Sequence, residues 1–232
     1  DLDPLENEEG IQLNWIKNYQ NLDKFDLIIL PGSKQTIKDI TFLTETGLIK
    51  CILEYSKKNG NILGICGGLQ MLGEYLEDPY SKEGLNTSKK ESIRGIGLLP
   101  LKTIFKKTKI TKRIVCEATW PCTTKVEGFE IHNGVTELIK RRGEKNFKNM
   151  FKQKELGWFI DNNERGSIAG SYLHGIFDND KWRINYLNLI RIKKGIQILD
   201  KKNIPYKIKR EAIINNLAGQ FKKHINIESL LN

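Results

Sequence analysis

Two short apolar runs, each followed directly by a glycine-containing turn, restrict the fold of this chain. Residues 26–30 read DLIIL and stop at the turn 31–33, and residues 61–65 read NILGI and enter the turn 66–68. Runs of this length that end in turn residues are typical of strands buried inside a sheet. Apolar residues at helical spacing separate the two runs over 45–58 and resume after the second turn, where they predict a helix over 69–76. This alternation of strand and helix predicts an α/β fold with a parallel sheet.

The rest of the chain predicts further strands, two polar loops and two terminal helices. Alternating or apolar stretches predict strands at 10–16, 95–101, 113–116, 126–132 and 167–174. Polar or charged composition predicts surface loops at 78–92 and 140–154. Apolar faces at helical spacing predict two helices, around 182–190 and 213–221.

Charge and cysteine content exclude several function classes. Lys and Arg exceed Asp and Glu by 38 to 28, for a net charge of +10. The lysines are scattered in pairs without interleaved aromatic residues, so a solvated basic surface explains the charge better than a nucleic-acid partner. Nothing approaches the roughly 18–20 apolar residues that span a membrane, and the acidic start lacks the features of a signal peptide. The four cysteines form no CxxC pair, so we expect no metal site and reduced thiols in a cytoplasm.

Residues 64–68 carry the first chemical signal. They read GICGG, the G-x-C-x-G form of a nucleophile elbow, in which a strand turns sharply into a helix and presents the central side chain for attack. Glycines tolerate such a turn, and the N-terminus of the following helix favours the thiolate form of Cys66. The backbone amide of Gly67 would then bind an oxyanion. The alternative is a buried core cysteine beside an ordinary turn, because free cysteine is among the most buried residue types.

Two more residues are predicted to lie at the same edge of the sheet as Cys66. Gly32 follows the preceding strand at its carboxyl end, where parallel sheets place their sites, so its amide is a candidate for the second oxyanion donor. His174 closes the predicted strand 167–174 and is one of only three histidines. We therefore expect His174 to act as the general base for Cys66.

Four stretches can be taken together: 30–36 (LPGSKQT), 64–73 (GICGGLQMLG), 127–134 (EGFEIHNG) and 172–178 (YLHGIFD). In their residues, order and spacing they resemble the glutamine amidotransferase domain of the cobyric acid synthase family. The resemblance covers nearly the whole chain. It implies a class I, flavodoxin-like amidotransferase fold, with a mostly parallel sheet flanked by helices and residues 1–232 forming one domain.

The resemblance also implies a reaction. The family uses glutamine nitrogen and ATP to amidate peripheral carboxylates of the corrin ring in adenosylcobyrinic acid a,c-diamide, giving cobyric acid on the way to cobalamin. Carried onto this sequence, Cys66 is the nucleophile, His174 the base, and the amides of Gly32 and Gly67 hold the oxyanion. Gln70 is implied to lie near the bound glutamine, with an ordinary helix residue as the alternative.

Two further places in the sequence bear on the site: the stretch that contains Glu130, and the residue two positions after His174. By resemblance, Glu130 helps to line the glutamine pocket or the interface with a synthetase domain, and His132 beside it is interpreted as structural. Many class I amidotransferases carry His-x-Glu, whose Glu orients the imidazole, whereas Ile176 occupies that position here, as the family itself allows. Asp178, Glu130 or a residue of the synthetase domain are the alternatives for this third member.

The chain alone lacks the means for ATP chemistry. No Gly-Lys dipeptide occurs, so no phosphate-binding loop of the G-x-x-x-x-G-K-[ST] form is present. ATP and magnesium are therefore expected on an ATP-dependent synthetase domain that also carries the corrinoid, and the start without methionine suits a C-terminal piece of a longer protein. Alternatives are the amidotransferase of cobyrinic acid a,c-diamide synthase, that of lipid II amidation, a cysteine peptidase, or a non-catalytic module that binds glutamine or docks to a partner.

Overall fold

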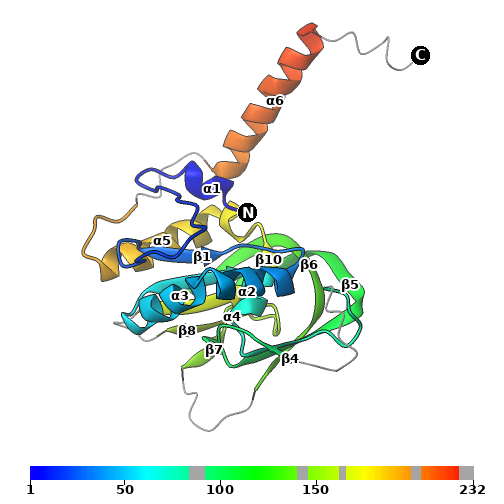
Figure 1. The fold of residues 1–232 in the computed structure, drawn as a ribbon. Coiled ribbons are helices and arrows are strands. Elements are labelled where there is room, and N and C mark those ends of the chain that lie inside the picture. Colours follow the sequence, from blue (N-terminus) through cyan, green and yellow to red (C-terminus); the bar gives the residue numbers. More distant parts are fainter. Residues whose placement is uncertain (84–91, 140–145, 162–165, 200–204, 225–232) are drawn as a thin grey trace.

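The computed structural model describes residues 1–83, 92–139, 146–161, 166–199 and 205–224, and these form two five-stranded sheets with flanking helices (Figure 1). The first sheet has the order β1 (Leu27–Leu30), β2 (Asn61–Ile65), β9 (Ser167–Ser171), β8 (Gly157–Asp161), β7 (Phe147–Asn149). The second has the order β10 (Leu173–His174), β6 (Thr124–Leu138), β5 (Leu101–Ala118), β3 (Tyr75–Glu77), β4 (Ser92–Arg94).

The predicted parallel arrangement is confirmed for the strands next to the candidate site. β1, β2 and β9 run parallel, with Leu30 opposite Gly64 and Ile65 opposite Ser171. Most other pairs are antiparallel, so the parallel part of the fold is smaller than the sequence predicted. The reason is the length of the connections. Five residues separate β8 from β9 and five separate β5 from β6, and connections this short cannot cross over to a parallel neighbour.

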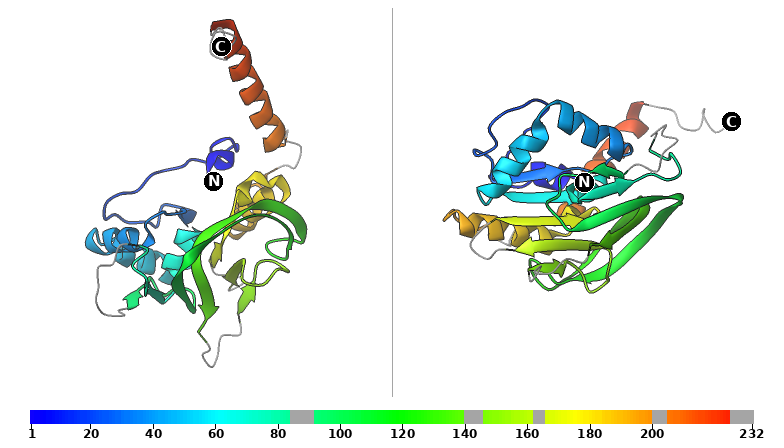
Figure 2. Two further views of the ribbon diagram at one scale, coloured as in Figure 1. Left: turned by 90° about the vertical axis from the view of Figure 1, so that its right-hand side faces the viewer. Right: turned by 60° about the horizontal axis from the view of Figure 1, so that its bottom comes forward.

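Helices lie on both sides of the first sheet. The helices are α1 (Asp3–Glu6), α2 (Thr36–Glu45), α3 (Leu48–Lys57), α4 (Gly67–Leu72), α5 (Asp180–Lys193) and α6 (Tyr206–His224), together with a short 3-10 helix, η1 (Ile176–Asp178). Figure 2 shows α2 and α3 over one face of the sheet and α5 on the other side, while α6 projects away from the body. None of the helices in the described residues is long and apolar enough to cross a membrane.

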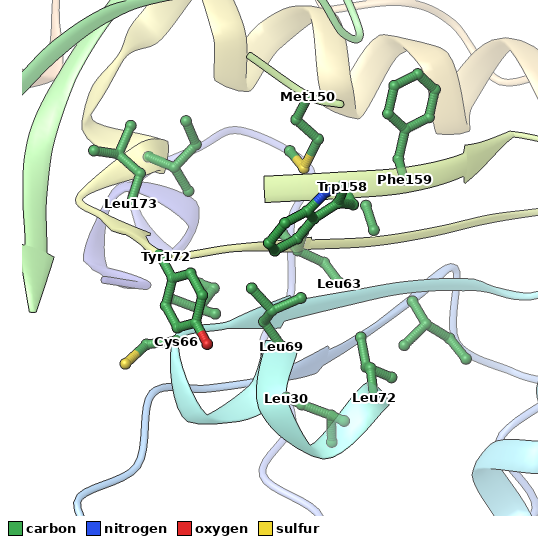
Figure 3. Packing of buried hydrophobic residues seen from close by; sticks show 14 of the residues in the cluster. Leu30, Leu63, Cys66, Leu69, Leu72, Met150, Trp158, Phe159, Tyr172 and Leu173 are labelled. Atoms are coloured by element: carbon green, nitrogen blue, oxygen red, sulfur yellow. The ribbon is translucent and has the colours of Figure 1, made fainter. Parts of the chain in front are cut away.

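The centre of the core holds α4 against the parallel strands. Leu69 of α4 is fully buried, and Gly170 of β9 leaves room for it, because a Cβ at Gly170 would lie 2.3 Å from Leu69 Cδ1. Figure 3 shows Leu69 and Leu72 among the side chains of Leu30 and Leu63. This packing fixes the N-terminus of α4 at the carboxyl ends of the strands.

Several predicted elements differ from those observed. Residues 10–16 form no strand, because their apolar side chains pack on the core without a pairing partner. Tyr75 and Leu76 were predicted to continue a helix but form β3, which gains pairing partners in β4 and β5. The second half of the predicted loop 140–154 contains β7 and the buried residues Met150 and Phe151, while its first part lies outside the described residues. α2 and β8 had no predicted counterpart.

Candidate active site

The candidate site is built around the backbone of Cys66. This residue connects β2 to α4 with φ 51° and ψ −106°. Residues other than glycine rarely adopt this backbone conformation, and one that is held in it stores about 1–3 kcal/mol of strain. Gly68 has no space for a side chain, because a Cβ there would lie 1.9 Å from the carbonyl oxygen of Leu30. The same is true of Gly64, whose Cβ would lie 2.5 Å from the nitrogen of Leu69. The predicted elbow therefore forms, with Cys66 at its apex.

The turn after β1 joins the elbow to His174. A Cβ at Gly67 would lie 2.8 Å from Ser33 Cβ, so the turn and the start of α4 are in close contact. A Cβ at Gly32 would lie 3.0 Å from His174 Cε1, so the imidazole lies against the other side of the same turn. Gly67 is the first residue of α4, and N–H groups in the first turn of a helix have no partner within it. The structure thus brings Gly32, Gly67, Cys66 and His174 together.

β6 of the second sheet pairs with the backbone at His174 and accepts a hydrogen bond from the Cys66 side chain. His174 lies opposite Phe129 in the β10–β6 pairing. Two residues farther along β6, the carbonyl oxygen of Ile131 accepts a hydrogen bond from Cys66 Sγ at 3.2 Å. In this structure the thiol therefore points to a backbone carbonyl, an arrangement that substrate can change, since catalytic hydrogen bonds often form only when substrate binds.

His174 is held by a residue that the sequence did not single out. Its Nδ1 lies 2.8 Å from Asp1 Oδ2, and the N–H of Gly175 donates to Asp1 Oδ1 at 2.7 Å. An ionised carboxylate only accepts hydrogen bonds, so this contact favours the tautomer with the proton on Nδ1. Asp1 and His174 are 173 positions apart, and no local pattern in the sequence marks such a contact.

Glu130 and His132 form a buried pair next to Cys66. Both side chains point to the buried face of β6, where His132 Nε2 lies 3.0 Å from Glu130 Oε1 and Lys112 Nζ lies 3.1 Å from Glu130 Oε2. The His132 ring stacks on Tyr172 with 3.7 Å between ring centroids. Burial lowers the pKa of His132, although Glu130 opposes that shift. Glu130 is thus engaged with His132 and Lys112, and its role in lining the glutamine pocket stays a prediction.

Gln70 lies one helical turn after Cys66 and is buried. Its Oε1 accepts a hydrogen bond from Thr36 Oγ1 at 3.2 Å, and its Nε2 donates to the Asn133 carbonyl at 3.1 Å and to Tyr172 Oη at 3.2 Å. These contacts tie α2, α4 and β6 together. Tyr172 in turn hydrogen-bonds to Thr136, and burial raises its pKa to about 12. Because its amide is engaged inside the protein, the role of Gln70 in binding glutamine stays a prediction.

The other cysteines lie outside this arrangement. Cys51 is buried in α3 and contacts the carbonyl of Gly47 at 3.6 Å. Burial raises the pKa of Cys116 to about 11, which keeps its thiol protonated. Within the described ranges, no three His, Cys, Asp or Glu side chains are grouped as a metal site requires. Among the cysteines, Cys66 alone stands at a strand-to-helix elbow.

Comparison with known proteins identifies relatives of the chain. Residues 1–182 match the model of the CobB/CobQ-like glutamine amidotransferase domain. The cobyric acid synthase of Prochlorococcus marinus strain AS9601 is 57% identical over 232 residues, and that of strain MIT 9515 is 59% identical over 233 residues. Each match covers 100% of this chain and 46% of the relative, so the chain spans about half the length of these curated relatives.

Two solved structures share the fold. A crystal structure of a glutamine amidotransferase aligns with a TM-score of 0.56 at 12% identity, covering 84% of this chain and 92% of that one. The structure of PurLQS from Thermotoga maritima aligns with a TM-score of 0.55 at 13% identity, covering 82% of this chain and 90% of that one. The family model extends over well more than half of the sequence. The chain belongs to the CobB/CobQ-like family of glutamine amidotransferase domains.

Proposed function

We propose that this chain is the glutaminase domain of a cobyric acid synthase. It hydrolyses glutamine and supplies the ammonia for ATP-dependent amidation of corrin-ring carboxylates, converting adenosylcobyrinic acid a,c-diamide to cobyric acid in cobalamin biosynthesis. One observation carries the proposal: the turn after β1 contacts His174 through Gly32 and the cysteine elbow through Ser33. The names of the relatives support the choice of reaction.

The reaction begins at the thiol of Cys66. His174 Nε2 takes the thiol proton, and the sulfur attacks the side-chain carboxamide carbon of glutamine, forming a C–S bond while the carbonyl electrons move onto oxygen. The amides of Gly32 and Gly67 donate hydrogen bonds to that oxyanion. When the oxyanion collapses, the C–N bond breaks and the departing nitrogen takes the proton from His174, so that ammonia leaves.

A water molecule completes the cycle. His174 accepts a proton from this water, whose oxygen attacks the carbonyl carbon of the γ-glutamyl thioester. The C–S bond breaks, glutamate leaves, and the proton returns from His174 to the sulfur of Cys66. The thiol, which donates to Ile131 in the absence of glutamine, must turn toward His174 before the first step.

His174 fits the role of base better than His132 does. The side chain of His174 is 23% exposed and its Nδ1 lies 2.8 Å from Asp1, so we assign proton exchange with the thiol to Nε2. His132 Nε2 is instead directed at Glu130, and the ring is covered by Tyr172. Burial also lowers the pKa of His132, which disfavours its charged form. His132 therefore serves the packing of the site wall.

The ATP-dependent half of the reaction is assigned to another part of the protein. The chain spans 46% of the length of its cobyric acid synthase relatives, and its sequence holds no phosphate-binding loop. We assign residues 1–232 to a single amidotransferase domain without a cofactor of its own. ATP, magnesium and the corrinoid belong to the synthetase domain, which must dock here so that ammonia passes between the two sites.

Labelling with diazo-oxo-norleucine, a glutamine analogue with an electrophilic carbon, tests the assignment of Cys66. We expect peptide mapping by mass spectrometry to find the label on Cys66 and to find Cys51, Cys116 and Cys122 unmodified. Cys66→Ser should abolish both labelling and glutaminase activity. Cys116→Ser is the matched control, since it makes the same atom change outside the site and should leave both unchanged. Label on another cysteine, or full activity in Cys66→Ser, would show that the assignment is wrong.

Reconstitution with the synthetase domain tests the reaction itself. The isolated chain should hydrolyse glutamine slowly and show no ATP binding by calorimetry. Added synthetase domain, ATP and adenosylcobyrinic acid a,c-diamide should stimulate glutamine hydrolysis and give an amidated corrinoid. Stimulation by cobyrinic acid or by lipid II instead would assign the chain to one of the sister reactions. Tight ATP binding by the chain alone would contradict the proposed division of labour.

A further inference from the structure

The carboxylate of Asp1 makes two directional contacts with consecutive residues at the site. Oδ2 lies 2.8 Å from His174 Nδ1, and Oδ1 accepts the N–H of Gly175 at 2.7 Å. The side chains of Asp1 and His174 are 21% and 23% exposed, so the pair lies at the rim of the site and not in open solvent. Because both oxygens are engaged, the carboxylate has a defined orientation. In that orientation Oδ2 is directed at Nδ1, the imidazole nitrogen that does not exchange a proton with the thiol in the proposed mechanism.

We propose that Asp1 is the positioning residue for His174, a role that rests on the proposed glutaminase function. A carboxylate at Nδ1 keeps the proton on that nitrogen and leaves the lone pair of Nε2 for the thiol of Cys66. It also fixes the ring plane against Gly32, whose Cβ position lies 3.0 Å from His174 Cε1. The site then has the cysteine, histidine and carboxylate that a triad requires, with the carboxylate supplied by the segment before α1.

The carboxylates nearer in sequence do not reach the imidazole. Glu130 is directed at His132 and Lys112. Asp178 lies beyond Gly175, where a Cβ on that glycine would be 3.6 Å from Asp178 Oδ2, and its described ion-pair partner is Arg210 at 3.6 Å. Ile176, in the position where other class I enzymes carry Glu, is fully buried. Of the alternatives raised from the sequence for the third member, neither residue of this chain is therefore supported.

The segment that carries Asp1 is anchored to the body of the protein. Leu5 of α1 is 1% exposed and belongs to the main core. Glu8 Oε2 lies 2.9 Å from Nε of Arg183, and both side chains are about 95% buried. Arg183 Nη1 also donates to the carbonyl of Phe177 in η1 at 2.6 Å, directly after the loop that contains Gly175. These contacts hold the start of the chain against η1, so Asp1 is positioned before substrate binds.

The tautomer of His174 gives a direct test. In the wild-type chain under mildly alkaline conditions, ¹⁵N NMR should show a protonated Nδ1 and an unprotonated Nε2. In Asp1→Asn the side-chain amide can donate to Nδ1, so the Nε2–H tautomer should gain population. A wild-type His174 with its proton on Nε2 would overturn the proposal, and that result needs no variant that might fold poorly.

The rate of Cys66 labelling by diazo-oxo-norleucine gives the second readout. Loss of the orienting carboxylate costs about 10⁴-fold in a buried Ser-His-Asp site, and water can partly replace a carboxylate that is 21% exposed. We therefore expect Asp1→Asn to lower the maximal rate of labelling by about 10²-fold and to leave the concentration for half-maximal rate within about threefold. Asp3→Asn is the matched control, because it removes an exposed carboxylate two residues away.

The outcomes separate this proposal from the proposed function. Slow labelling of Cys66 in Asp1→Asn, an unchanged labelling rate in Asp3→Asn and a shifted His174 tautomer in Asp1→Asn support Asp1 as the positioning residue. A wild-type labelling rate in Asp1→Asn overturns it, as does an equal loss in both variants, which would indicate a general effect of the segment. If the wild-type chain takes no label on Cys66, the glutaminase proposal fails, whereas the tautomer measurement still decides whether Asp1 controls His174.

Discussion

Replacement of Gly68 by alanine is a sharp test of how the elbow is built. Gly68 is the second residue of α4, and a Cβ added to it would lie 1.9 Å from the carbonyl oxygen of Leu30. Contacts below 3.0 Å are essentially never seen for Cβ atoms, so α4 and β1 must separate by about 1.1 Å. The oxygen belongs to the backbone of a strand, since Leu30 lies opposite Gly64 in β2. It therefore cannot rotate away as a flexible side chain would.

The expected cost combines two opposing effects. Overpacking of a core costs typically about 1–3 kcal/mol and occasionally more, and a backbone-to-backbone clash belongs at the upper end. Alanine in place of glycine inside a helix increases the free energy of unfolding by about 0.8–1 kcal/mol, because alanine has the higher helix propensity. We expect a net loss of about 2 kcal/mol in the free energy of unfolding. For a protein of about 150–250 residues, that corresponds to a fall of about 4–8 °C in the melting temperature.

Urea denaturation followed by tryptophan fluorescence measures this loss, because Trp120, Trp158 and Trp182 are buried. Gly219→Ala is the matched control: it makes the same change in a helix, α6, where nothing lies within 4 Å of the new Cβ. It should not lower the stability. Labelling of Cys66 should also slow in Gly68→Ala, because separation of α4 from β1 moves Gly67 away from Ser33. A Gly68→Ala protein within about 0.5 kcal/mol of wild type would refute this account of the elbow.

Two further predictions concern buried charges. Arg183→Met removes the guanidinium that lies 2.9 Å from the buried Glu8 carboxylate. Because removal of one partner leaves a buried charge unpaired, urea denaturation should show a loss of about 3–5 kcal/mol in the free energy of unfolding, and a loss below about 1 kcal/mol would contradict this expectation. Burial lowers the pKa of His132 in the folded protein, so as pH falls the unfolded chain binds a proton at this residue first, and the free energy of unfolding falls below about pH 6.5. When pH is lowered from about 7 to about 5, His132→Gln should therefore lose less stability than the wild type loses. Equal losses in the two proteins would exclude His132 as the cause.

The parts of the fold that could be predicted have local signals. The run at 61–65 predicted a strand that the structure bounds at Asn61–Ile65, because an apolar run with a glycine turn at its end has few other uses in a folded protein. The glycines around Cys66 predicted the elbow for the same reason, since only a residue without a side chain fits so close to the backbone of Leu30. The prediction that Gly32 and His174 lie close to Cys66 followed from their positions at the ends of predicted strands.

The parts that could not be predicted depend on distant partners. Tyr75 and Leu76 continue the helical spacing of α4, yet they pair as a strand because β5 offers a free edge beside them. Apolar residues of α6 such as Ile213 and Leu217 also keep helical spacing, but these side chains are 64% and 59% exposed. Periodicity shows that an apolar face exists and leaves open what covers it. Asp1 is a similar case, since its contact partner His174 lies 173 positions away in the sequence.

The location of the site follows from the junction of the two sheets. The parallel strands β1, β2 and β9 deliver the Gly32 turn and the Cys66 elbow to one edge, because Leu30 lies opposite Gly64 and the N–H of Cys66 donates to the Ser171 carbonyl. His174 follows β9 closely in the sequence, but its own strand, β10, pairs with β6 of the other sheet. β6 also holds the thiol through Ile131. A shift of β6 relative to the first sheet would therefore change the surroundings of nucleophile and base together, whereas Asp1 reaches the base from the side of η1 and would act on it alone.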